Sequence, residues 1–134
     1  MSIRFPYQYK RVDYGQILDP QVLIPILTTK GWSASWFLLD SGADVTSLPL
    51  RLAKYLKTEL VKERPVEVSG VGKGSVRGYP SKISIKINDE ILPIRCYFIE
   101  NLEIISLLGR LDVFDKYDIC FESSKKEVTF KRLG

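Results

Sequence analysis

A carboxylate follows directly on a run of large apolar residues in the stretch FLLDSGADVT, residues 37–46. The apolar run begins at Trp36 and ends at Leu39, and Asp40, Ser41 and Gly42 come next. A charged carboxylate at the end of a buried strand loses hydration, which costs free energy. Two interpretations are open at this point: the strand ends in a surface turn, or the carboxylate is held there for chemistry.

The triplet Asp40-Ser41-Gly42 alone favours the turn. All three residue types are common in turns. Average residue usage produces an Asp-[Ser/Thr]-Gly triplet in roughly one chain in twenty of this length. A catalytic interpretation therefore needs further features of the chain.

Length and composition predict one globular domain. The chain has 134 residues, of which 45% are apolar and 27% charged, and this length is too short for two ordinary domains. The longest apolar runs, at 22–27 and 36–39, are far shorter than a membrane span. The first ten residues lack a continuous apolar segment, so we expect no secretory signal and a cytoplasmic protein.

The absence of histidine excludes several kinds of catalytic site. No residue of the 134 is histidine, which removes Ser-His-Asp and Cys-His nucleophiles and His-based zinc motifs. In a hydrolase of this composition, carboxylates are the plainest groups to move protons. The net charge is +4, but the basic residues are scattered, which favours a solvated surface over a nucleic-acid interface. We expect no metal, no cofactor, no nucleic acid and no membrane as partners.

Residue patterns predict a mainly β fold with two short helices. The segment 82–88, KISIKIN, alternates strictly between polar and apolar residues, as a strand with one buried face does. A short helix is expected after Ser47, with Ser47 as its N-cap and Pro49 in its first turn. The other strands are expected at 21–28, 33–39, 91–98, 117–122 and 127–132, and a second helix around 112–116. Residues 1–20 carry little periodic signal and are predicted to be an arm or an irregular segment, and residues 21–134 a single domain.

The glycines between 66 and 79 predict a hairpin with a flexible tip. This segment contains Gly70, Gly72, Gly74 and Gly78. A phosphate-binding loop is the alternative interpretation of its GVGKG sequence. That alternative is weak, because the spacing does not match a dinucleotide motif and a strand, not a helix, follows.

The order and spacing of these features resemble the retropepsins, the retroviral-type aspartic proteases, and their single-domain prokaryotic homologues. Asp-Ser-Gly follows an apolar strand, the glycine-rich hairpin comes about 30 residues later, and Leu-Leu-Gly-Arg at 107–110 comes about 70 residues later. The resemblance covers roughly residues 20–132. It implies a mainly β, closed acid-protease barrel with short helices and one half-site per chain.

The resemblance also implies roles for the residues around the aspartate. Asp40 would be the catalytic aspartate, and Ser41 would bond across a dimer to hold the two active-site loops together. Gly42 would let the backbone come close to the carboxylate. Asp44 would bind substrate main chain and form a partly buried ion pair with Arg110.

Two further segments match the family pattern. Gly70, Val71 and Gly72 match the tip of the flap that closes over a bound peptide. The loop around Asp40 would be supported by Ser41, Gly42, Ala43, Leu108, Gly109 and Arg110. The chain departs from the pattern in the flap, where Lys73 replaces a small residue, and after Arg110, where Leu111-Asp112 replaces an immediate polar residue.

Stoichiometry then predicts a homodimer. Hydrolysis of an amide without metal or histidine takes two carboxylates that face one water, one ionised and one protonated. Asp13-Tyr14-Gly15 lacks the hydroxyl residue and the apolar strand, so the chain has one complete motif. We therefore expect a C2 dimer that cleaves extended protein or peptide substrates. The resemblance implies that the N- and C-terminal segments add intermolecular strands.

A second interpretation keeps the fold without the chemistry. A retropepsin-like dimer that has lost useful catalysis would act as a peptide-binding or assembly module. Cleavage that depends on Asp40 separates the two.

Overall fold

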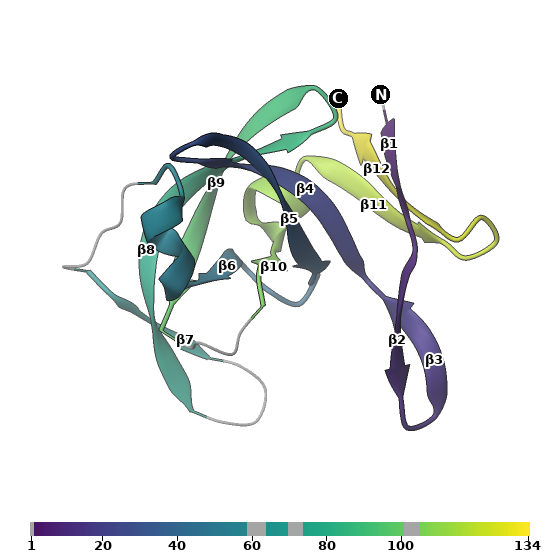
Figure 1. Cartoon of the computed structure of the whole chain (residues 1–134), viewed down its shortest axis with the longest axis horizontal. Coiled ribbons are helices and arrows are strands. Elements are labelled where there is room, and N and C mark those ends of the chain that lie inside the picture. Colours follow the sequence, from purple (N-terminus) through teal and green to yellow (C-terminus); the bar gives the residue numbers. More distant parts are fainter. Residues whose placement is uncertain (1, 59–63, 70–73, 101–104) are drawn as a thin grey trace.

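The computed structural model describes residues 2–58, 64–69, 74–100 and 105–134, and the fold is mainly β (Figure 1). The strands and short helices follow one another in the order β1 (Ser2–Pro6), β2 (Gln8–Val12), β3 (Gly15–Asp19), β4 (Gln21–Thr28), β5 (Gly31–Leu39), β6 (Thr46–Pro49), η1 (Leu50–Tyr55), β7 (Val66–Ser69), β8 (Ser75–Ile87), β9 (Glu90–Ile99), β10 (Leu107–Leu108), η2 (Arg110–Phe114), β11 (Tyr117–Glu122) and β12 (Glu127–Arg132). None of the helices in these ranges is long and apolar enough to cross a membrane.

Seven strands form the main sheet, in the order β4-β5-β10-β6-β9-β8-β7. An additional pairing between Ile26 of β4 and Ile85 of β8 joins the two ends of the run β4 to β8, so the sheet closes on itself. β10 lies parallel to β5 and antiparallel to β6. The two-residue strand β10 thus stands in the middle of the sheet, next to the end of β5.

The core follows from the alternation of apolar residues along long strands. In β8, the residues Ile83, Ile85 and Ile87 are buried while the residues between them are not fully buried. β4 and β9 contribute in the same way, and the buried residues they add are Val22, Ile24, Ile26, Leu92, Ile94, Cys96 and Phe98. Burial of such side chains stabilises the fold by roughly 1.5–3 kcal/mol each.

Three strands lie in the first 20 residues, where the sequence predicted an arm or an irregular segment. β1 pairs with β12, and β2 and β3 form a separate two-stranded hairpin. β12 lies between β1 and β11 in a three-stranded sheet of the same chain. The expectation that terminal strands pair between two copies is therefore wrong for β12, because both of its edges are already occupied.

The first short helix begins later than the sequence predicted. Ser47 lies in the buried strand β6 and is not an N-cap. The helix η1 begins at Leu50, after Pro49, and no side chain caps it. Parallel pairing of β6 with β9 draws residues 46–49 into the sheet, and this pairing overrides the local capping preference.

The second helical segment, η2, is distorted and anchored by an ion pair. Asp112 has a positive φ of 69° and is buried. Its Oδ2 accepts hydrogen bonds from the backbone N–H and the Nε of Arg95, at 2.9 and 3.0 Å, and its Oδ1 accepts one from Nη2 at 2.9 Å. Hydrogen bonding by the Arg95 side chain lowers the pKa of Asp112 to about 2. The pair fixes η2 against β9.

We predict that Asp112→Asn lowers the melting temperature by a few degrees, about 3–6 °C, at pH 7. Asparagine tolerates a positive φ, so the backbone can keep its conformation, and the change removes the charge and one of the two oxygens that accept from Arg95. The Asp112 pKa is depressed in the folded state, so its stabilising effect is present above the ordinary value near 3.9 and is lost as pH falls toward 2.

Thermal unfolding of wild type and Asp112→Asn from pH 2 to 7 measures the difference between their melting temperatures. This difference should become smaller below pH 4. The exposed Asp118→Asn on β11 serves as the matched control and should leave the melting temperature unchanged. A constant difference at every pH would show that the carboxylate charge of Asp112 is not responsible.

Candidate active site

The strand β5 carries Asp40 to the surface at its C-terminal end. Phe37 and Leu39 point into the core, while Trp36 on the other face is 46% exposed. The N–H of Leu39 donates to the carbonyl of Pro20 at 2.8 Å, and the N–H of Asp40 donates to the carbonyl of Leu108 at 3.1 Å. These backbone bonds hold the aspartate, which is itself half-buried in the single chain.

The loop after Asp40 is folded onto the aspartate. The N–H of Gly42 donates to Asp40 Oδ1 at 3.0 Å, and the N–H of Ala43 donates to the Asp40 carbonyl at 3.1 Å. Ser41 and Gly42 are exposed. The carboxylate is thus oriented by its own loop and faces a surface that a second molecule can reach.

The segment that follows β10 binds the far side of the same loop. The N–H of Arg110 donates to the Ala43 carbonyl at 2.9 Å, and the N–H of Leu111 donates to the Asp44 carbonyl at 3.0 Å. Leu108 is fully buried beneath these contacts. The structure therefore brings residues 40–44 and 108–110 together, as the family resemblance implied.

Gly109 occupies a position where no side chain fits. A Cβ atom at Gly109 would lie 2.5 Å from the carbonyl carbon of Val45 and 2.8 Å from the backbone nitrogen of Thr46. The N–H of Gly109 donates to Thr46 Oγ1 at 3.0 Å, and Thr46 is fully buried. Sequence reasoning missed Thr46, although a hydroxyl residue six positions after the aspartate was visible in the sequence.

The Asp44–Arg110 ion pair is present but is not partly buried. Arg110 Nη2 contacts Asp44 Oδ1, with side chains 49% and 85% exposed respectively. Arg110 Nη1 also donates to the Ser41 carbonyl at 2.7 Å. The expected burial of the pair is wrong in the single chain, so the pair itself contributes at most about 1 kcal/mol to folding. The Arg110 guanidinium thus contacts both ends of the loop, at Ser41 and at Asp44.

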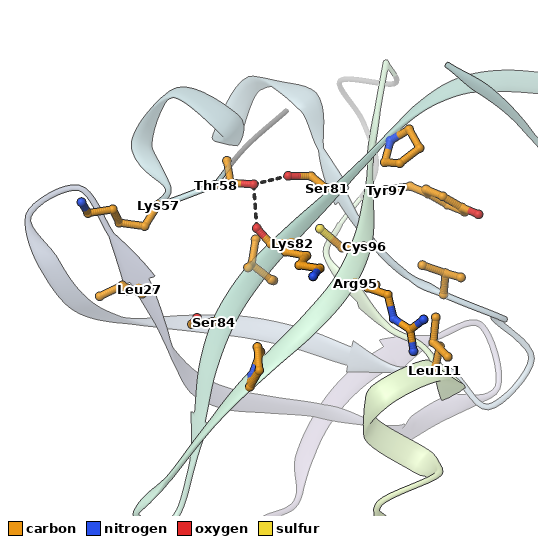
Figure 2. A pocket seen from close by; sticks show the side chains of 14 residues that line it. Leu27, Lys57, Thr58, Ser81, Lys82, Ser84, Arg95, Cys96, Tyr97 and Leu111 are labelled. Carbon is orange, nitrogen blue, oxygen red and sulfur yellow. Dashed lines mark hydrogen bonds between the residues drawn. The ribbon is translucent and has the colours of Figure 1, made fainter. Parts of the chain in front are cut away.

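A cavity of about 940 Å³ adjoins this loop without including Asp40 (Figure 2). It lies along β8 and β9 and is bounded by Val45 and Leu111, the residues that follow Asp44 and Arg110. Cys96 is also part of its lining. Burial raises the pKa of the Cys96 thiol to about 12, so the thiol is protonated at neutral pH and is no nucleophile.

The hairpin that the glycine-rich segment predicted is formed by β7 and β8, which pair from Val66–Gly78 to Ser69–Ser75. The predicted flap-tip residues Gly70, Val71 and Gly72 lie outside the described residues.

Among the residues that the structure does describe, no group of three His, Cys, Asp or Glu side chains is placed to hold a metal ion.

Solved structures that resemble this chain include retroviral and retropepsin-like proteases. A retropepsin-like aspartic protease from Rickettsia conorii has a TM-score of 0.57 and 18% identity, over 97% of this chain and 89% of that chain. EIAV protease in complex with the inhibitor HBY-793 has a TM-score of 0.46 and 23% identity, over 67% of this chain and 82% of that chain. The retroviral protease-like domain of Ddi1 from Leishmania major has a TM-score of 0.45 and 17% identity, over 84% of this chain and 93% of that chain.

No protein-family model and no curated protein sequence matches this chain. The likeness to the Rickettsia conorii protease spans nearly the whole of both chains. At 18% identity it establishes the fold, which is mainly β and retropepsin-like.

We predict that Gly109→Ala does not fold stably, while Gly42→Ala does. The added Cβ at position 109 meets backbone atoms that cannot move aside, which costs about 3 kcal/mol or more. At position 42 the only close atom is the Asp40 Oδ1, 3.2 Å away on a side chain that can shift. Soluble yield and thermal unfolding of the two variants measure the difference. Equal stability of both variants would contradict the close contact at Gly109.

Proposed function

We propose that this protein is an aspartic endopeptidase that acts as a homodimer and hydrolyses peptide bonds of extended polypeptide. The proposal rests on the position and orientation of the Asp40 carboxylate. Its carboxylate is oriented by the Gly42 N–H at the end of a core strand and lies half-buried at an accessible surface of a retropepsin-like fold. Each chain has one complete Asp-Ser-Gly motif.

The proposed mechanism uses two Asp40 carboxylates, one from each copy. The ionised carboxylate takes a proton from a water that lies between them, and the water attacks the substrate carbonyl. The protonated carboxylate donates its proton as the carbon–nitrogen bond breaks, and the leaving amine departs. The pair is regenerated with one proton between two carboxylates, so no histidine or metal is needed.

The neighbouring residues take supporting roles in this proposal. Ser41 bonds across the dimer, and Gly42 and Ala43 shape the loop around the carboxylate. Asp44 binds the main chain of the substrate, held by Arg110 through the contacts to both ends of the loop. Gly70, Val71 and Gly72 close over the substrate as the flap tip.

We predict that Asp40→Asn abolishes cleavage of an unfolded protein substrate at every pH. Wild-type activity should be greatest in mildly acid solution, because the reaction needs one protonated and one ionised carboxylate. Release of peptides from unfolded protein, measured between pH 3.5 and 7, tests this. The matched control is Asp118→Asn, an exposed aspartate on β11, which should cleave as wild type does. Peptide binding by wild type without any cleavage would support the assembly-module alternative instead.

We also predict that Asp40→Asn dimerises more tightly than wild type at neutral pH. Two ionised carboxylates that face each other repel, and the asparagine variant removes this repulsion while Asp44 and Arg110 stay unchanged. The dissociation constant should differ by roughly ten- to a hundredfold at pH 7, since like charges in contact cost a few kcal/mol.

Sedimentation of both forms from pH 4 to 8 measures the dissociation constants. The wild-type constant should be the larger of the two at pH 7, because only the wild type brings two carboxylates face to face. Equal dissociation constants of the two forms at pH 7 would mean that the two carboxylates do not face each other.

A further inference from the structure

The β2–β3 hairpin forms a two-stranded sheet that pairs with no other strand of the described residues. In Figure 1 it projects from the body of the protein on the same side as the end of β5. An isolated two-stranded hairpin is only marginally stable in water. Its two outer edges carry backbone groups that are free to pair with another chain.

The hairpin carries exposed apolar side chains. Tyr9 on β2 is 46% exposed and Ile17 on β3 is 44% exposed, while Tyr14 at the turn is fully exposed. The two strands differ in charge, because β2 contains Lys10 and Arg11 and β3, with the sequence GQILD, contains only an aspartate at its end. Charged side chains protect an edge strand against pairing, so β3 is the less protected of the two edges.

The base of the hairpin lies beside the candidate catalytic aspartate. Pro20 follows β3 directly, and its carbonyl accepts the N–H of Leu39, the residue before Asp40, at 2.8 Å. In the proposed dimer, where two Asp40 side chains meet, the base of each β3 strand therefore lies near the interface.

We infer that the β2–β3 hairpin is the dimerisation arm of this protein, and that β3 of one copy pairs antiparallel with β3 of the second copy across the two-fold axis. The inference rests on the proposed homodimer. It names the surface that forms that dimer, and β12 cannot take this role because both of its edges are paired within the chain.

Charge and register favour β3 over β2 for this pairing. In a symmetric antiparallel pair over all of β3, Ile17 of one copy lies opposite Ile17 of the other, and Gln16 lies opposite Leu18. The same arrangement of β2 would place Lys10 opposite Lys10, and like charges directly opposite each other are destabilising. The β3 pairing also covers Ile17, which the single chain leaves exposed.

The experiment introduces a charge at position 17 and then complements it. Ile17→Lys and Ile17→Glu are prepared separately, and sedimentation gives the dissociation constant of each and of their equimolar mixture. Each variant alone should dimerise on the order of a hundredfold more weakly than wild type, because like charges meet on the axis. The mixture should regain most of the affinity as a Lys–Glu heterodimer, and the melting temperature of the monomer should be unchanged.

The matched control is Ile91→Lys, the same substitution at an isoleucine of β9 that is 57% exposed. It should dimerise as wild type does. Wild-type affinity of Ile17→Lys, or a mixture that is no tighter than its components, would overturn the inference. So would a wild-type protein that stays monomeric at high concentration.

Failure of this inference can be told apart from failure of the proposed function. If Ile17→Lys stays dimeric and cleaves substrate in an Asp40-dependent way, the protease proposal stands and the arm is elsewhere. If the mixture of charged variants regains affinity but no cleavage depends on Asp40, the β2–β3 hairpin is the dimerisation surface and the protease proposal fails.

Discussion

The arrangement around the candidate site depends on the close approach of the Gly109 backbone to Val45 and Thr46. This approach lets β10 sit between β5 and β6, so that the N–H of Asp40 can donate to the carbonyl of Leu108. A side chain at position 109 would separate the two segments, since its Cβ would overlap the Val45 carbonyl. One steric condition, the absence of a side chain at position 109, is therefore needed for three features. These are the orientation of the carboxylate, the shape of its loop and the closure of the sheet.

Sequence reasoning succeeded where one local pattern decided the structure. The segment 82–88, predicted as a strand from its period-two alternation, falls in β8 up to Ile87. The expected strands at 21–28, 117–122 and 127–132 match β4, β11 and β12. The proximity of Asp40 to Leu108 and Gly109 was predicted through the family resemblance. The Arg95–Asp112 pair was missed because its partners come from different elements and meet only after β9 and η2 have packed together.

Residues 1–20 escaped prediction for a different reason. In the β2–β3 hairpin, apolar side chains occur on both faces: Tyr9 lies opposite Leu18 on one face, and Ile17 lies opposite Lys10 on the other. A strand that buries one face in its own chain shows alternation, but this hairpin has no core of its own to face. The hairpin therefore gave no periodic signal from which its strands could be predicted.

The apolar run before Asp40 can now be explained by its two faces. Phe37 and Leu39 belong to the core, whereas Trp36 lies on the outer face of β5 and is partly exposed. Asp40 itself is half-buried, so the single chain bears little of the cost of a dehydrated carboxylate. In the proposed dimer that cost would arise only when a second copy covers the loop, at the moment when a shared proton becomes available to offset it. Folding of the chain and activation of its carboxylate would then be separate steps, the first controlled by the Gly109 contact and the second by association.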